Sequence, residues 1–168
     1  MQGQDACPED ILYTVHDRDE IDAIEPLWYL LSAHHREEAR SNARAFVEEM
    51  EARSFAARRD ELLGKNRDRA LRIEIARDRA SGRAVGYCVA SGVSGGHGEV
   101  ESIFVDEAYR NRGVGGALLE HAAAWMDGLG TVEQILSVFS GNGSVLPFYA
   151  RHGFSPRFVV LVRRVPGP

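Results

Sequence analysis

The sequence predicts one α/β domain, an α+β mixed sheet flanked by helices, and three observations lead to that fold class. Residues 70–93 alternate like a two-stranded hairpin, residues 99–105 enter a glycine-rich loop and a helix, and residues 135–139 form another apolar run. Strand, helix and strand in this order make a crossover between parallel strands, whereas a hairpin pairs antiparallel ones. At 168 residues and 44% hydrophobic, the chain suits a single domain over residues 1–168.

The first seventy residues are expected to form a short strand followed by helices. Residues 11–16 are apolar enough for a strand, and Asp17 or Asp19 can cap the next helix. One face of that helix carries Ile21, Ile24, Leu27, Trp28 and Leu31, while Pro26 can kink or divide it. Residues 36–69 are charged and rich in helix formers. A thinner apolar stripe there consists of Phe46, Val47, Met50 and Phe55.

The second half of the chain alternates strands with helices. Residues 70–77 and 84–93 form the hairpin, with Ser81-Gly82 at its turn, and residues 99–105 form the next strand. A helix then extends to about Asp127, with Leu118, Ala122 and Trp125 on one side.

The remaining elements complete the predicted crossover. Glycines end the helix near residues 128–130, and Ile135–Phe139 is expected as a buried strand. A short helix over Ser144–Arg151, closed by Gly153, and a last strand over Phe158–Val165 follow. Ligands gather at the carboxyl ends of strands in such units, so the loop after Val105 is the expected binding site.

Composition excludes several classes of protein. A formal net charge of -5 argues against a nucleic-acid-binding protein, which needs a basic face, and weakly favours a cationic substrate. Cys7 and Cys88 cannot make a disulfide framework, and neither a secretory leader nor an apolar run of membrane-spanning length is present. A cytoplasmic protein without nucleic-acid or membrane partners is therefore expected. Lys65, the only lysine, is interpreted as a consequence of arginine-rich coding.

The loop from Arg110 to Gly116, Arg-Asn-Arg-Gly-Val-Gly-Gly, has the features of an anion cradle at a helix start. Several backbone N–H groups of a first helical turn have no intrahelical partner, and the helix dipole adds positive potential. Glycines at 113, 115 and 116 let the backbone approach a phosphate. The loop lacks the ending of a nucleotide P-loop and the spacing of a dinucleotide fingerprint, which leaves a diphosphate on another cofactor open.

Arg110-x-x-Gly113-x-Gly115, preceded by Ile103-Phe104-Val105, resembles the acyl-CoA signature of the GNAT superfamily of N-acetyltransferases. A second block, from Asn142 through Tyr149 to Gly153-Phe154, resembles that family's "N...FY...GF" segment. The resemblance covers roughly residues 71–157, whereas the first seventy residues share only the order of a strand and helices.

The resemblance implies a mixed twisted sheet and a site for acetyl-CoA. Backbone groups of Ile103 and Val105 would contact the pantetheine arm, residues 110–116 would hold the pyrophosphate, and Asn142 would contact the arm. An amide chain can extend along a strand edge, and a diphosphate suits backbone N–H groups and arginines. The predicted cofactor site comprises Ile103, Phe104, Val105, Arg110, Asn111, Arg112, Gly113, Val114, Gly115, Gly116 and Asn142.

Acetyl transfer to an amine needs a base, a stabilised oxyanion and a proton for the leaving thiolate. Glu101 is the preferred base, with Glu99 or water as alternatives, and a backbone N–H near Val105 would polarise the thioester carbonyl. In a regular strand both glutamates would share a face with Ile103 and Val105, and a bulge would change that. Tyr149 resembles the family's general acid.

No metal is expected, because adjacent histidines such as His34 and His35 point in different directions on a helix. Trp28 and His34 fall where this family builds its acceptor pocket, although Trp28 also suits the core.

The sequence therefore predicts an acetyl-CoA-dependent N-acetyltransferase that acts on a primary amine of a small molecule or peptide. The alternative is a non-catalytic acyl-CoA sensor or regulatory module. Tyr149 and Glu101 favour the enzyme, since a sensor needs neither an acid nor a base. A longer acyl donor and a homodimer stay open.

Overall fold

The computed structural model describes residues 10–42, 53–161 and 163. Cys7 and the predicted stripe residues Phe46, Val47 and Met50 lie outside the described residues. Within them, five strands form one sheet in the order β1-β2-β3-β4-β5, with β4 and β5 parallel and the other neighbours antiparallel. The strands are β1 (Ile11–His16), β2 (Ala70–Asp78), β3 (Ala84–Gly92), β4 (His97–Val105) and β5 (Glu133–Leu136). The mixed sheet confirms the predicted fold class.

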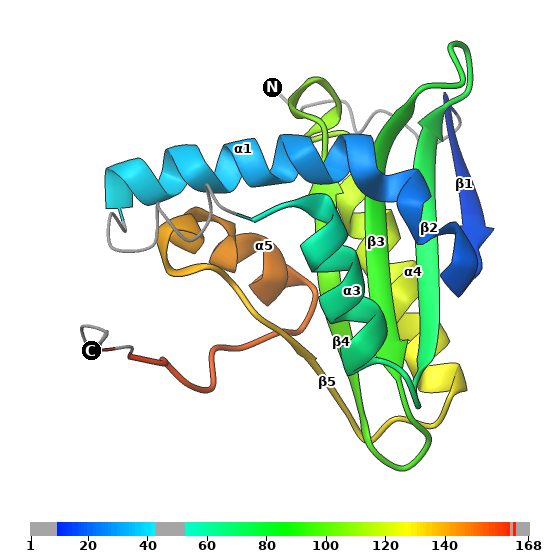
Figure 1. The fold of residues 1–168 in the computed structure, drawn as a ribbon, viewed down its shortest axis with the longest axis vertical. Coiled ribbons are helices and arrows are strands. Elements are labelled where there is room, and N and C mark those ends of the chain that lie inside the picture. Colours follow the sequence, from blue (N-terminus) through cyan, green and yellow to red (C-terminus); the bar gives the residue numbers. More distant parts are fainter. Residues whose placement is uncertain (1–9, 43–52, 162, 164–168) are drawn as a thin grey trace.

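Helices cover both faces of the sheet (Figure 1). They are α1 (Glu25–Asn42), α3 (Phe55–Lys65), α4 (Val114–Gly128) and α5 (Leu146–Arg151), with short 3-10 segments at Arg18–Ile24, Glu107–Tyr109 and Ser140–Val145. Helices α1 and α3 lie on one face, and α4 lies on the other.

Local signals explain how the first helical segment begins and divides. Asp17 starts it with a capping box, in which its own backbone N–H donates to Glu20 Oε2 at 3.0 Å. The segment is a 3-10 helix as far as Ile24, and α1 takes over at Glu25 with Pro26 in its first turn. Proline is tolerated in a first turn because its missing N–H would have no intrahelical acceptor there. The predicted helix is therefore divided, and Pro26 lies at the start of its second part.

Two apolar clusters lie on opposite faces of the sheet. Tyr87 and Val89 point toward α1 and α3, whereas Cys88 and Ala90 point toward α4, as the alternation of a strand requires. Both clusters consist of fully or nearly fully buried side chains. The shared sheet therefore joins the two halves of the core.

The end of the chain departs from the sequence prediction. Strand β5 ends at Leu136 and not at Phe139, and the residues of the predicted strand Phe158–Val165 that are described form no strand. The side chains of residues 158–161 are 81–90% exposed. Apolar composition favours a strand, but a strand also needs a partner, and this segment runs away from β5 in Figure 1. Among the described residues, no helix is both long and apolar enough to cross a bilayer.

Candidate active site

A bulge in β4 sets the direction of its side chains. Val89 pairs with Ser102 but Ala90 pairs with Val100, so Glu101 is the extra residue. Val100 thus points toward α4 with Ile103 and Val105, whereas Glu101 contacts residues on the α3 side. The regular-strand expectation, which put both glutamates on the face of Ile103 and Val105, was therefore wrong.

The edge of β4 beyond the bulge faces away from β3. Asp106 N donates to Val85 O at 2.8 Å, which makes Val85 and Asp106 a hydrogen-bonded pair. Because such pairs alternate along an antiparallel ladder, the N–H and C=O groups of Ile103 and Val105 point away from β3.

Strand β5 does not cover this edge. Its register with β4 runs only from His97 to Val100, and the two strands then diverge (Figure 1). Among the described residues, no strand therefore pairs with positions 101–105 on this side. This open edge of β4 begins at the bulge and ends at the loop that follows the strand.

The glycine-rich loop follows this open edge of β4 and leads into α4. Gly113 is the N-cap of α4 in the left-handed region, with φ 79°, and Asn111 also has a positive φ of 58°. The first intrahelical bond runs from Ala117 N to Gly113 O at 2.9 Å, so the preceding N–H groups of the turn have no helical acceptor. Val114 is buried and anchors the turn to the core.

The two loop arginines differ in their surroundings. Arg110 Nε donates to Val105 O at 3.1 Å, and its guanidinium lies 5.8 Å from the centroid of the Phe104 ring. Arg112 is exposed and lies 5.2 Å from the centroid of the Tyr109 ring. Both keep positive charge at the start of α4.

Asn142 and Tyr149 come from the segment after β5. The side-chain Oδ1 of Asn142 is buried, and none of the described residues donates a hydrogen bond to it. Tyr149 packs with Phe148 and Phe154 against the cluster on the α4 side. Burial, with a smaller contribution from Cys88, raises the pKa of Tyr149 to about 12. Its phenol therefore keeps its proton at neutral pH.

Glu101 is held by side chains from α3 and β3. Its Oε1 accepts from Ser91 Oγ at 2.8 Å and from Asn66 Nδ2 at 3.0 Å, and its Oε2 lies 2.8 Å from Lys65 Nζ. The same Nζ lies 2.8 Å from Glu99 Oε2. Arg58 Nη2 donates to the backbone carbonyl of Glu101 at 2.8 Å and so holds the bulge.

These contacts decide the ionisation of Glu101. Burial of the carboxyl group raises its pKa, but hydrogen bonds from Lys65, Ser91 and Asn66 outweigh burial, and the net effect lowers the pKa. Glu101 is therefore a carboxylate at neutral pH.

A hollow of about 540 Å³ lies between α1 and the end of β4. Its lining residues are Leu30, His34, Glu38, Phe104, Asp106, Glu107 and Arg110. His34 thus belongs to this hollow, whereas Trp28 is buried in the core. Among the described residues, no group of three or more His, Cys, Asp or Glu side chains could hold a metal ion.

Sequence reasoning missed Lys65, Asn66 and Ser91. Lys65 and Asn66 reach Glu101 only through the packing of α3 on the sheet, and Ser91 reaches it through the pairing of β3 with β4, so no local sequence pattern links these residues to it. The fact that Lys65 is the only lysine was the one signal that could have drawn attention to it.

Comparisons with known proteins identify the family to which the chain belongs. The sequence model of the acetyltransferase (GNAT) family matches residues 27–154. A comparison with curated protein sequences found no match.

Solved structures with a similar fold include a ribosomal-protein-alanine N-acetyltransferase from Brucella melitensis, which is 17% identical with a TM-score of 0.61 and covers 94% of this chain and 100% of that one. An aminoglycoside N-acetyltransferase, AAC(6')-Iy, in complex with CoA is 19% identical with a TM-score of 0.56, over 93% of this chain and 100% of that one. The BH1408 protein from Bacillus halodurans, in a tetramutant form, is 13% identical with a TM-score of 0.68, over 92% and 99%.

Proposed function

Because the chain belongs to the GNAT family of acetyltransferases, we propose that it transfers an acetyl group from acetyl-CoA to a primary amine of a small molecule or peptide. The observation that carries this proposal is the open edge of β4, which leads from the bulge at Glu101 to the glycine-rich loop. An extended amide chain can lie along such an edge while its diphosphate meets the N–H groups that begin α4.

The residues present fit this donor. The backbone groups of Ile103 and Val105 lie on the edge of β4 that β5 does not cover, where the Val105 carbonyl already accepts from Arg110 Nε. The buried Oδ1 of Asn142 is an acceptor for which the described residues provide no donor. Buried polar atoms are usually paired, so such an acceptor suits an amide N–H of the arm. The arm would then extend along residues 101–105 of β4, with its thioester between Val105 and Glu101.

The acceptor's ammonium nitrogen loses two protons in the reaction. Glu101 accepts the first, directly or through water, and the amine nitrogen forms its bond to the acetyl carbon. A backbone N–H near Val105 polarises the thioester carbonyl, the carbon–sulfur bond breaks, and Tyr149 gives its phenolic proton to the sulfur. The second proton of the nitrogen then returns to the Tyr149 oxygen, directly or through water, and restores the phenol. Glu101 approaches from the α3 side and Tyr149 from the α4 side, so the acid and the base do not compete for one position.

The named acceptors of two structural neighbours, a ribosomal protein's alanine and an aminoglycoside, both carry amines. They support an amine acceptor here without specifying it.

A screen of amines with acetyl-CoA, in which free thiol is followed, tests the proposal. Thiol release that depends on an amine and is lost in Tyr149→Phe is expected. If CoA binds but no amine in the screen stimulates the release of free thiol from acetyl-CoA, the non-catalytic sensor is favoured instead.

A further inference from the structure

The ammonium group of Lys65 forms ion pairs with two mostly buried carboxylates beside the bulge. Lys65 Nζ lies 2.8 Å from Oε2 of Glu99 and 2.8 Å from Oε2 of Glu101. The glutamate side chains are 14% and 2% exposed, whereas that of Lys65 is 43% exposed. Lys65 is thus the most exposed of the three charged groups.

A second observation concerns Asn66, whose side chain contacts Glu101. Asn66 is 0% exposed, and its Nδ2 donates to Leu62 O and to Oε1 of Glu101, each at 3.0 Å. Its Oδ1 is buried, and no described residue donates a hydrogen bond to it. An alkylammonium ion carries three N–H donors, so the amide that contacts Glu101 offers an acceptor that such an ion can use.

We propose that Glu99 and Glu101 bind the ammonium of the acceptor, and that Lys65 is an internal ammonium that occupies this position until the acceptor displaces it. The inference rests on the proposed acetyl transfer, and it narrows the acceptor to a primary alkylammonium ion. Exchange of one ammonium for another keeps an ion pair for both carboxylates. Departure of Lys65 alone would remove the ion pair that the two share and leave Glu101 only its hydrogen bonds from Ser91 and Asn66.

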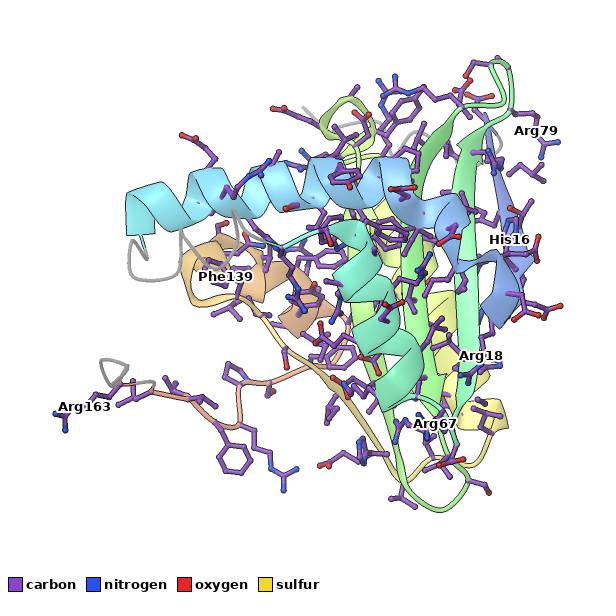
Figure 2. The ribbon with its side chains drawn as sticks, in the orientation of Figure 1. His16, Arg18, Arg67, Arg79, Phe139 and Arg163 are labelled. Carbon is purple, nitrogen blue, oxygen red and sulfur yellow. The ribbon has the colours of Figure 1, made fainter. Side chains whose placement is uncertain are left out.

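The contacts of the neighbouring residues allow Lys65 to move while the carboxylates stay in place. Arg18 Nη2 donates to the carbonyls of Asn66 and Arg69, at 2.7 and 2.8 Å, which fixes the turn after α3 (Figure 2 labels Arg18 beside it). Arg58 holds the Glu101 carbonyl. Lys65 is in the last turn of α3 with a flexible four-carbon stem.

Because Lys65 is the only lysine, ¹³Cε-lysine labelling gives one lysine resonance. Titration of the labelled protein with n-butylammonium chloride should move that resonance toward the position of a solvent-exposed lysine. Sodium chloride at equal ionic strength and n-butanol should not move it. A resonance that stays in place at saturating n-butylammonium overturns the proposal.

Calorimetry on variants provides a second readout. Lys65→Met should bind n-butylammonium about tenfold more tightly than the parent, since the internal competitor no longer reduces the fraction of open sites. Arg67→Met removes one positive charge from an exposed neighbour and should leave the affinity unchanged. Equal affinities of Lys65→Met and the parent for n-butylammonium would contradict the proposal. If Lys65→Met does not fold, the titration of the lysine resonance in the parent protein decides whether Lys65 is displaced.

Different results would contradict the proposed acetyl transfer and the proposed ammonium site. Displacement of Lys65 without any thiol release would contradict the acetyl transfer and retain the ammonium site. Amine-dependent thiol release with an unmoved Lys65 resonance would contradict the ammonium site alone.

Discussion

Arg110 fastens the glycine-rich loop to the strand before it, because its Nε donates to the carbonyl oxygen of Val105 at 3.1 Å. Arg112 makes no such contact and lies over the Tyr109 ring. The two arginines should therefore contribute differently to CoA binding: Arg110 by holding the loop in its binding conformation, and Arg112 mainly by its charge.

Arg110→Lys keeps the charge but removes the guanidinium bond to Val105. We expect CoA affinity to fall about tenfold, since a hydrogen bond from a charged donor contributes about 1.5–3 kcal/mol. Arg112→Lys is the matched control and should lose less than half of that free energy. Calorimetry that finds equal losses would assign both arginines the same role.

Tyr149→Phe keeps the ring that packs with Phe148 and Phe154 but deletes the hydroxyl. Amine-dependent thiol release should fall about a hundredfold with CoA affinity unchanged, as is typical for loss of a general acid. Since its pKa is raised to about 12, the parent's rate should show no titration of this group between pH 6 and about 10. Undiminished turnover in the variant would make Tyr149 a packing residue.

Glu101 should link stability to pH on the acid side. Its native pKa is lowered, so its contribution to the free energy of unfolding is complete above the ordinary glutamate pKa of about 4.3 and is lost as pH falls through the lowered native pKa. Urea unfolding from pH 7 to pH 3 should show a smaller loss of stability for Glu101→Gln than for the parent. Asp68→Asn, at an exposed position, should behave as the parent does.

His35 should link the free energy of unfolding to pH at higher pH values than Glu101 does. Burial, and to a lesser degree the charge of His34, lowers its pKa to about 4, and its ring lies 5.8 Å from that of Phe139, which Figure 2 labels beneath α1. The unfolded chain binds a proton near pH 6.5 and the native protein does not, so stability should fall as pH falls from about 6.5 to about 4. His35→Gln should remove that decline. An NMR titration of His35 with a pKa near 6.5 would contradict this prediction.

Elements with local signals were predicted well. The strand Ile11–His16, the hairpin of β2 and β3, and the crossover from β4 to β5 through α4 are present, with boundaries shifted by a few residues. A capping residue, a turn and a period of alternation each depend on neighbours in sequence, which is why these elements could be anticipated.

Features that depend on distant partners could not be anticipated. The bulge at Glu101 is a property of the pairing between β3 and β4, and it reverses the face on which both glutamates lie. Lys65 meets Glu99 and Glu101 only because α3 packs over these strands. The apolar segment at residues 158–161 has strand propensity, but propensity does not supply the partner that a strand requires.

CoA calorimetry on the parent and Gly115→Val decides whether CoA binds along β4 with its diphosphate at the start of α4. A Cβ at Gly115 would lie 3.5 Å from Val105 Cγ2 and 3.6 Å from Phe148 Cζ, so the further methyl groups of valine have to crowd the strand end or the bound diphosphate. Gly128→Val, in the same helix with nothing within 4 Å of its Cβ, is the matched control. We expect the parent and Gly128→Val to bind CoA equally, and Gly115→Val, folded by circular dichroism, to bind at least about tenfold more weakly. A parent that does not bind CoA, or a folded Gly115→Val that binds it as tightly as the parent, would show that CoA does not bind at this loop.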